Sequence, residues 1–598
     1  MNAAAMNLAN AREVPLGAAE VDFEHRADGT ILLRSPQPLA AHAIKLTERL
    51  VHWSRETPAQ IFIGQRDTDG SWRSLTYAET YRRVRALGQA LLDRRLSQDR
   101  PLAILSDNDI EHALLALACM HVGITYVPIS SAYSLVSTDH AKLKHVIGLL
   151  TPGLVYATDG ERYAKAIAAA VPRSTEVLRA EDIGKLLATA PSAAVDTAHA
   201  AVGPDTIAKF LLTSGSTGQP KAVINTQRML CSNQQMLTQS LPSLRSTPPV
   251  LVDWLPWNHT AGSNHNLGIV LNHGGTLYID EGRPVPGLIE KTVRNLREVG
   301  PTIYFNVPRG YEALLPFLRE DAELRKSFFS RLGLLQYAAA VLPQPIWKAY
   351  EDLAVQTCGE RILWITGYGA TETAPAAMFT NRGAARAGSV GLPVDGVEMK
   401  LVPMADKLEA RFRGPSITPG YWRQPELTTA AFDEEGYYRT GDAMRFVDPA
   451  DPRQGFEFDG RTTEDFKLTT GTWVSVGPLR AKINSACSPL VQDVVITGHD
   501  RPSLGALVFP NAVVCRDLDA AELHARLQPV FDRLGRDSTG SSTRIGRAMI
   551  MERPASIDAS EITDKGSINQ RAVLKNRAAL VERLYAEPPD ASIIVASP

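Results

Sequence analysis

The amino-acid sequence predicts an α/β protein in which a large amino-terminal domain of parallel and mixed sheets covered by helices precedes a small, mobile α+β domain. Two observations carry this prediction. Short apolar, β-branched runs alternate with segments of helical periodicity, as expected for parallel sheets covered by helices. Near Asp459 a turn-rich stretch gives way to a second series of short elements. Domain movements are absorbed at linkers of this kind.

The expected strands are apolar runs too short to be helices of ordinary length. The most apolar segment, 113–129, is interrupted by His121 and Gly123. We therefore expect a core helix followed by a strand there, not a membrane span. The other runs predicted to be strands lie at 101–105, 125–129, 210–213, 250–255, 302–307 and 362–366.

The clearest amphipathic helix is predicted over residues 76–92. Thr76 and Glu79 have the spacing of a capping box, in which each side chain bonds the other residue's backbone N–H. Leu87 and Leu91 then recur at helical spacing. This helix would open the large domain.

The domain boundaries follow from these patterns. We expect a loose leader over residues 1–40, the large domain over 41–459 and the mobile lid domain over 460–598. Inside the last part, strands are predicted at 494–496 and 506–509 and a helix at 520–534.

Composition and charge exclude several classes of protein. Of the 598 residues, 44% are hydrophobic and 21% charged, and the net charge is −2, which does not favour binding to nucleic acid or an anionic membrane. Five scattered cysteines without C-x-x-C spacing argue against a disulfide framework or a zinc site, so we expect buried thiols. Residues 1–21 contain two glutamates and no apolar run, unlike a signal peptide. The cytoplasm is the expected location.

The strongest functional signal is the loop over residues 212–221, which reads Leu-Thr-Ser-Gly-Ser-Thr-Gly-Gln-Pro-Lys. Glycines let backbone N–H groups close around phosphate oxygens, hydroxyls donate further bonds, and Lys221 adds positive charge. The loop lacks the GKS or GKT ending of a Walker A motif. These residues predict a site for a phosphate leaving group.

The loop resembles the T-S-G-S-T-G-x-P-K signature of the acyl-adenylate-forming superfamily, the AMP-binding acyl- and aryl-CoA synthetases. Residues 366–372, 438–442 and 460–461 resemble the family's G-Y-G-x-T-E, Y-R-T-G-D and hinge motifs, in the family's order. Weaker matches lie at 123–128, 413–415 and 420–422.

The resemblance implies a role for each matching residue. Tyr368 would stack on adenine, Thr371 would bind the α-phosphate and Glu372 would hold Mg²⁺, a cation that prefers carboxylate oxygen. Asp442 would accept both ribose hydroxyls, and Arg461 would lie at the domain junction. The implied nucleotide-binding set is Thr213, Ser214, Gly215, Ser216, Thr217, Gly218, Lys221, Tyr368, Gly369, Thr371, Asp442 and Arg461.

The carboxyl-terminal part departs from the family pattern. The family's late lysine follows a glycine, whereas Lys565 here precedes Gly566, and a gapless alignment puts Ser567 in its place. We assign Lys565 to adenylation because the reaction needs a cation between the carboxylate and the α-phosphate. With Thr371, Glu372 and Lys221, it completes the expected catalytic set.

These departures resemble the bacterial feruloyl-CoA synthase branch of the family, as do the runs 223–231 and 253–260. In that branch the acyl pocket would lie at 256–266 and 366–377, where small alanines leave room for a flat aryl-propenoate. The expected acyl-pocket residues are His259, Ala261, Asn264, His265, Gly367, Ala374, Ala376 and Ala377, and the expected CoA-tunnel residues are Lys467, Gly471 and Trp473.

The resemblance thus implies an AMP-forming carboxylate–CoA ligase, an enzyme that uses ATP with Mg²⁺ and takes coenzyme A as co-substrate. Feruloyl- or hydroxycinnamoyl-CoA synthesis is the expected activity. The expected partners are a small carboxylic acid, ATP and CoA, with no nucleic acid and no membrane insertion, and a homodimer stays open. Two alternatives also stay open: an adenylation enzyme that loads another aryl or fatty acid onto CoA or a carrier protein, and a degenerate nucleotide-binding partner protein.

Overall fold

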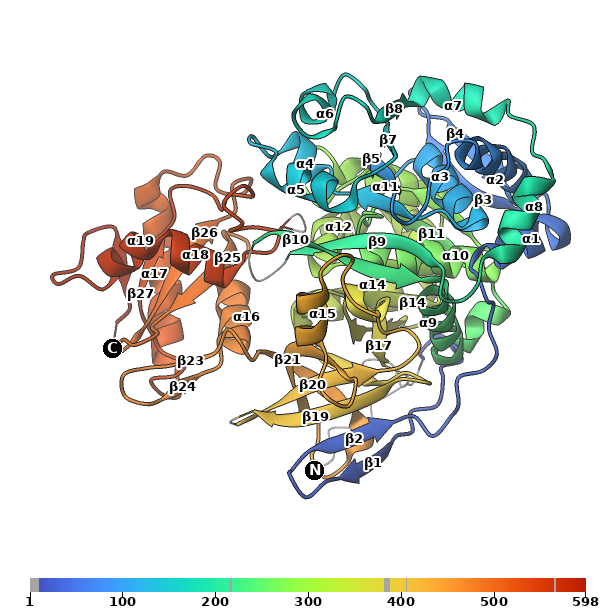
Figure 1. Ribbon diagram of the computed structural model, residues 1–598. Helices are drawn as coiled ribbons and strands as arrows, with labels where there is room; N and C mark the ends of the chain where they lie inside the picture. Colours follow the sequence, from blue (N-terminus) through green and yellow to red (C-terminus); the bar gives the residue numbers. More distant parts are fainter. Residues whose placement is uncertain (1–9, 215–217, 381–387, 405, 564–565, 598) are drawn as a thin grey trace.

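The computed structural model describes residues 10–214, 218–380, 388–404, 406–563 and 566–597. Figure 1 shows a large body formed by most of the chain and, beside it, a smaller unit formed by the carboxyl-terminal part. Helices cover sheets throughout, so the predicted α/β class is confirmed.

The large body contains a six-stranded sheet whose strands are parallel except at one edge. The exception is the pair β9 and β10, an antiparallel hairpin whose connecting loop carries the phosphate-loop sequence. In sheet order the strands are β10 (Pro220–Thr226), β9 (Ile207–Ser214), β6 (Tyr126–Ile129), β5 (Leu102–Leu105), β7 (Leu154–Ala157) and β8 (Glu176–Arg179).

Two further sheets lie in the body, and they include the remaining predicted strands. All six runs predicted to be strands contain a strand of the structure. One sheet is formed by β11 (Val250–Asp253), β12 (Thr276–Ile279), β3 (Ile61–Arg66) and β4 (Trp72–Thr76), and the other by β13 (Ile303–Asn306), β14 (Leu334–Tyr337) and β15 (Leu363–Ile365).

A nine-stranded sheet corrects the expectation of a loose leader. Its edge is formed by β1 (Asp22–His25) and β2 (Ile31–Arg34), within the first 40 residues. Ile31 and Leu33 are buried because they alternate toward the core, a two-residue period within a run too short to stand out in the sequence. The other strands, in order, are β19 (Glu398–Met404), β20 (Lys407–Arg413), β21 (Tyr438–Phe446), β22 (Phe456–Arg461), β18 (Ser389–Pro393), β17 (Ala376–Phe379) and β16 (Gly367–Gly369).

The predicted helix over 76–92 is confirmed as α2 (Tyr77–Leu92), and Thr76 caps it by accepting a bond from the Glu79 N–H. Only this half of the capping box forms, because the Glu79 carboxylate instead pairs with Arg83 one turn later. The apolar segment after residue 113 is also confirmed as a core helix followed by a strand, α3 (Ile110–Val122) and then β6.

The carboxyl-terminal unit has its own four-stranded sheet and its own apolar core. The two strands and the helix predicted there are confirmed as β25, β26 and α17. The elements are β25 (Val491–Thr497), β26 (Leu504–Pro510), β27 (Ile545–Ile550), β28 (Ile593–Val595), α16 (Val476–Cys487) and α17 (Ala520–Arg536).

Burial of the cysteines agrees in part with the expectation. Three of the five thiols are buried and two are half-buried, and all five are free. Within the described residues, none of the helices combines the length and the apolar character that crossing a bilayer requires.

A buried histidine predicts acid sensitivity of the large body. His121 of α3 is buried and stacks on His199 of α8 (Ala193–Ala201), with ring centroids 4.0 Å apart. Burial lowers the pKa of His121 to about 3, whereas an unfolded histidine titrates near 6.5. Below about pH 6.5 only the unfolded chain takes up this proton, so we expect stability to fall by about 1.4 kcal/mol per pH unit.

Thermal midpoints at pH 7.5 and pH 5.5 test this expectation. From pH 7.5 to pH 5.5, the thermal midpoint should fall less in His121→Phe than in the parent. His25→Gln, on the exposed strand β1, should show the same fall as the parent. Equal losses in the parent and His121→Phe would refute the assignment.

Candidate active site

The β9–β10 hairpin positions Lys221 and Thr213 as a cross-strand pair at the base of the predicted phosphate loop. Lys221 belongs to the start of β10 rather than to the loop, and its Nζ lies 4.0 Å from the ring centroid of Tyr421. Thr213 Oγ1 is buried without a hydrogen-bond partner in the described chain. Ser214 ends β9 and Gly218 adopts a φ of +84°, while Gly215, Ser216 and Thr217 lie outside the described residues.

Glu372 lies beside this hairpin in the short 3₁₀ helix Thr371–Thr373, and both Thr371 and Glu372 are buried. Glu372 Oε1 accepts a bond from the Tyr421 hydroxyl at 3.1 Å. Burial lowers the pKa of Lys221, and the Glu372 charge opposes that shift. Tyr421 therefore contacts both the lysine and the acid, which keeps the two charges close to each other and to β9.

The chemistry of this site fits Mg²⁺. Glu372 offers a hard carboxylate oxygen, and Mg²⁺ bound with a nucleotide typically takes only one or two protein carboxylates, with phosphate oxygens and water completing its shell.

The predicted adenine and ribose residues form one connected group. The Tyr368 hydroxyl donates to Asp442 Oδ2 at 2.6 Å, and Arg461 Nε lies 3.3 Å from Asp442 Oδ1. Asp442 and Arg461 are register partners on β21 and β22. Burial raises the pKa of Asp442, and the Arg461 charge opposes the rise. The carboxylate is thus held between an aromatic hydroxyl and a cation.

Tyr368 lies in a strand that needs glycine on both sides. A Cβ on Gly367 would meet the Met378 carbonyl oxygen at 2.4 Å, and one on Gly369 would overlap the Pro375 carbonyl. The close approach of β16 and β17 therefore excludes larger residues at both positions.

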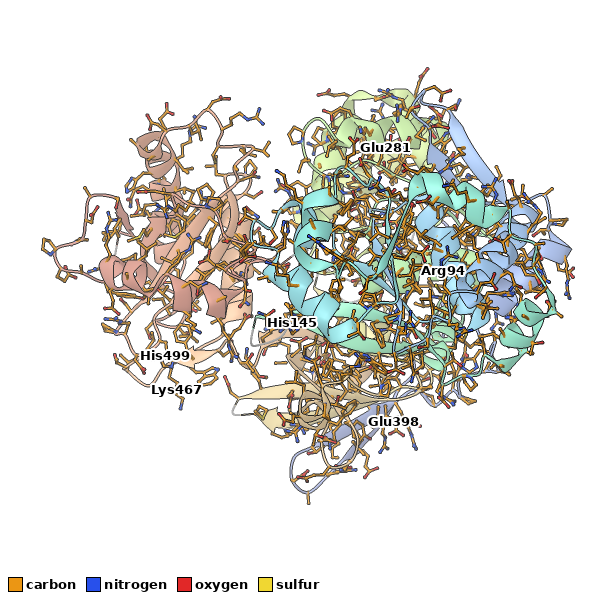
Figure 2. The ribbon with its side chains drawn as sticks, turned by 45° about the horizontal axis from the view of Figure 1, so that its top comes forward. Arg94, His145, Glu281, Glu398, Lys467 and His499 are labelled. Atoms are coloured by element: carbon orange, nitrogen blue, oxygen red, sulfur yellow. The ribbon has the colours of Figure 1, made fainter. Side chains whose placement is uncertain are left out.

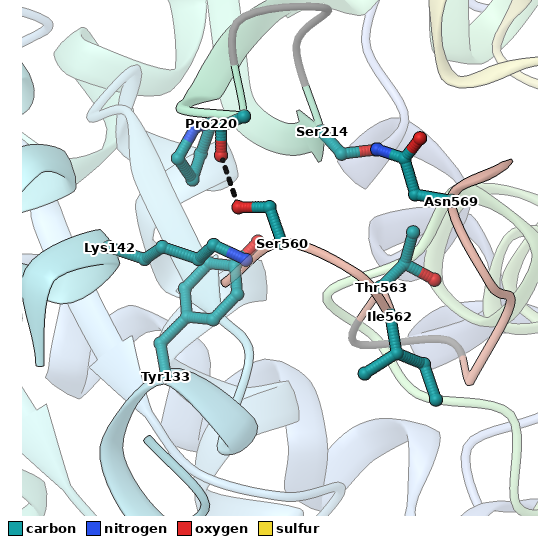
Figure 3. Close-up of a pocket in the computed structure, with 9 residues that line it drawn as sticks. Tyr133, Lys142, Ser214, Pro220, Ser560, Ile562, Thr563 and Asn569 are labelled. Carbon is teal, nitrogen blue, oxygen red and sulfur yellow. Dashed lines mark hydrogen bonds between the residues drawn. The ribbon is translucent and has the colours of Figure 1, made fainter. Parts of the chain in front are cut away.

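The residues that flank Lys565, the predicted adenylation lysine, approach the residues that flank the phosphate loop. Lys565 itself lies outside the described residues, but Thr563 and Asn569 line a pocket together with Ser214 and Gly218. Figure 3 shows Asn569 reaching toward Ser214 across this pocket. The Thr563 N–H donates to the Ser567 carbonyl, and Ser567 is exposed.

Most of the predicted acyl-pocket residues lie on a π-helix, Ala261–Asn266, and on or just before β17, while Gly367 begins β16. π-Helical turns are frequent at functional sites. His259 is half-buried just before this helix. Ala374, Ala376 and Ala377 are buried, and the Asn233 side chain bonds both the N–H and the carbonyl of Ala376.

Asn264 and His265 differ in whether their hydrogen-bonding groups are available to a substrate. The Asn264 amide donates to Asn225 Oδ1 at 2.8 Å and to Thr260 Oγ1 at 3.1 Å, so both donors are engaged within the protein. His265 Nδ1 lies 2.9 Å from Asn266 Oδ1, and burial lowers the pKa of His265 to about 4. His265 is therefore neutral at pH 7.

A buried glutamine beside His265, Gln336 of β14, was not predicted from the sequence, whereas Asn266 and Asp253 lie in runs that the sequence analysis names. Gln336 Nε2 lies 3.4 Å from His265 Nε2, and Gln336 Oε1 has no hydrogen-bond partner in the described residues. Asn266 Nδ2 and Asp253 Oδ2 are likewise unpartnered there. Burial raises the pKa of Asp253 to about 7. Gln336 in an apolar strand was the available signal, because a buried amide needs partners.

The predicted CoA-tunnel residues lie on a separate hairpin of β23 (Phe466–Lys467) and β24 (Trp473–Val474). Lys467 Nζ is 5.7 Å from the Trp473 ring centroid, and Gly471 turns the hairpin with a φ of +82°. Figure 2 shows Lys467 at the outer edge of the smaller unit, away from His145, which contacts β10 at the Pro220 carbonyl. This arrangement does not bring the hairpin to the phosphate loop.

Two family models match the chain. The model of the AMP-binding enzyme family covers residues 50–422, and the model of the AMP-binding enzyme C-terminal domain covers residues 465–588.

Curated proteins and solved structures agree with these matches. A carboxylic acid reductase of Mycobacterium marinum is 24% identical over 86% of this chain, which spans only 47% of that protein. A feruloyl-CoA synthase of Amycolatopsis sp is 28% identical over 62% of this chain and 70% of its own length. The A domain of carboxylic acid reductase from Segniliparus rugosus, solved with AMP and a co-purified carboxylic acid, is 20% identical with a TM-score of 0.70, covering 91% of this chain and 94% of that one.

Proposed function

Because this chain belongs to the AMP-binding enzyme family, we propose that it is an AMP-forming carboxylate–CoA ligase whose acid is a hydroxycinnamate such as ferulate. The observation that carries the proposal is the meeting of three elements at one hairpin. Lys221 and Glu372 lie together beside Tyr421, and the turn before Lys565 approaches the same loop from the smaller unit.

In the first half-reaction the acid's carboxylate attacks the α-phosphate of ATP and pyrophosphate leaves. Lys221 and the Thr213 hydroxyl would bind the leaving pyrophosphate, where negative charge accumulates. Lys565 would neutralise the charge between the carboxylate and the α-phosphate. Mg²⁺ held by Glu372 would act as a Lewis acid on the phosphate oxygens.

In the second half-reaction the CoA thiol attacks the acyl adenylate and AMP leaves. The hairpin of Lys467 and Trp473 lies away from the phosphate loop, so it would need to exchange places with the Lys565 turn. We infer that the smaller unit rotates about the segment near Arg461, which would bring this hairpin to the CoA arm.

The buried cluster around His265 supports a hydroxylated aryl acid. A neutral His265 that donates from Nδ1 to Asn266 accepts from Gln336 Nε2, so the free Gln336 Oε1 can accept a bond from a phenol. Burying a phenol without a partner costs about 1–3 kcal/mol. The relationship to a feruloyl-CoA synthase agrees with this substrate class.

The substrate proposal is tested by kcat/KM for ferulate, 4-coumarate, cinnamate and a medium-chain fatty acid. Ferulate and 4-coumarate should react well and cinnamate poorly, by a factor of up to about 10⁴ if the site is built to bond the hydroxyl. Gln336→Met and His265→Ala should reduce the ratio of 4-coumarate to cinnamate. Asn264→Ala is the matched control and should lower both substrates alike, since its amide bonds the protein.

The outcomes separate two claims. If kcat/KM for cinnamate equals that for 4-coumarate in the parent, the site does not recognise the ring hydroxyl. If kcat/KM for a medium-chain fatty acid exceeds the values for both cinnamates, the hydroxycinnamate assignment is wrong. The proposed adenylation chemistry would still stand.

A carrier protein is the alternative thiol acceptor, and the likeness to the A-PCP didomain of the Segniliparus rugosus carboxylic acid reductase, 20% identical with a TM-score of 0.71, favours keeping it. Thioester formation with free CoA, compared with a phosphopantetheinylated carrier, decides between them.

A further inference from the structure

Two side chains of the large body hold the segment that leads to the Lys565 turn. The N–H and the hydroxyl of Thr138 both donate to Asp558 Oδ2, at 3.0 and 2.8 Å. Lys142 of α5 (Ala141–Leu150) donates from Nζ to the Ile557 carbonyl at 2.6 Å. All three bonds join sequence positions more than 400 apart. We call the pair Thr138–Asp558 the clasp.

The segment that contains Asp558 is built onto the smaller unit. Glu561 accepts two bonds from the Arg577 guanidinium, at 3.0 and 2.6 Å, and Asn576 donates to the Ala559 carbonyl at 2.9 Å. These bonds stay within the smaller unit and would survive its rotation. The clasp joins the unit to the body and would not.

The clasp lies next to the phosphate loop. Two residues beyond Asp558, Ser560 Oγ donates to the Gly218 carbonyl at 3.3 Å, and the chain then enters the Lys565 turn at Thr563. Figure 3 shows Ser560 and Lys142 on the same side of this pocket. A contact at Asp558 therefore fixes where Ser560 and Thr563 meet Gly218, at the edge of the phosphate loop.

We propose that Thr138 and Asp558 are positioning residues for adenylate formation, which hold the Lys565 turn against the phosphate loop during the first half-reaction only. This inference rests on the proposed two-step function and adds residues that touch no substrate. Asp558 suits the role because bonds to a carboxylate are stronger than neutral ones. Although burial alone would raise the pKa of Asp558, bonds from Ser137 and Thr138 hold it below its ordinary value, so the group is charged at neutral pH.

The inference predicts opposite behaviour of the two half-reactions. A bond present in one arrangement and absent in the other shifts their populations by its full strength. Losing the clasp should slow adenylation by about fivefold to tenfold, the effect of one exposed charge-assisted bond. Thioester formation from a supplied acyl adenylate and CoA should not slow, because the clasp is open in that step.

The experiment measures both half-reactions in the full chain, with ferulate for pyrophosphate exchange and feruloyl adenylate plus CoA for transfer. The variants are Asp558→Ala and Thr138→Val, alone and together. The exchange rate of Asp558→Asn should lie between those of Asp558→Ala and the parent, since its amide oxygen still accepts from Thr138. Asp517→Asn, an exposed aspartate of the same unit, is the control for loss of a negative charge.

Selective loss of exchange, with the double variant no slower than the slower single variant, supports the clasp. Equal loss of both half-reactions, or no loss, overturns it. A parent that catalyses neither half-reaction would instead refute the proposed function, which keeps the two failures distinct.

Discussion

Replacing Lys221 by alanine is expected to slow adenylate formation by about 100- to 1000-fold, the effect typical of removing one preorganised group that stabilises developing charge. Lys221 is the second residue of β10, lies opposite Thr213 and is held over the Tyr421 ring, so its ammonium needs little reorganisation as pyrophosphate leaves. Acid-dependent pyrophosphate exchange measures the loss.

The fold of this variant should stay intact. Lys221 has lost part of its hydration, as its lowered pKa indicates, so removing the charge does not remove a strong surface interaction. Lys348→Ala, which breaks an exposed ion pair with Asp352, is the control for deleting a lysine. Near-normal exchange in Lys221→Ala would exclude the lysine from leaving-group stabilisation.

Lys565→Ala is expected to show the second large effect, a loss of pyrophosphate exchange by about 100-fold or more, because one cation between two negatively charged reactants disappears. The same variant should still convert a supplied acyl adenylate and CoA into thioester, since the turn that carries Lys565 is needed only in the first step.

Ser567→Ala is the matched comparison within the same turn. Ser567 is exposed, and its carbonyl already accepts the Thr563 N–H. It should therefore retain exchange. If Ser567→Ala is impaired and Lys565→Ala is not, the alignment that assigns the lysine is wrong.

The superfamily was readable from the sequence because its signals are local. The loop over 212–221 concentrates glycines and hydroxyls before Lys221, and three further motifs follow in the family's order. The family matches over 50–422 and 465–588 confirm that reading. Strands such as β5 and β9 were equally local, since a short apolar run bounded by turns is itself the signal.

Long-range pairing was not readable in this way. The strands β1 and β2 lie within residues 1–40, where the sequence predicts a loose leader. The strand β2 is held in place by pairing with β19. A four-residue strand becomes stable only when it pairs with other strands of a sheet, so residues 31–34 alone do not predict it.

The candidate site divides along the same line. Sequence alone predicted which residues carry phosphate chemistry, because that prediction depends on residue types in a contiguous motif. Tertiary structure alone decided that Tyr421 joins Lys221 to Glu372, that Gln336 Oε1 is left free beside His265, and that Asp558 reaches Thr138. These contacts join residues far apart in the chain, and whether a buried polar group finds a partner depends on what folding brings to it.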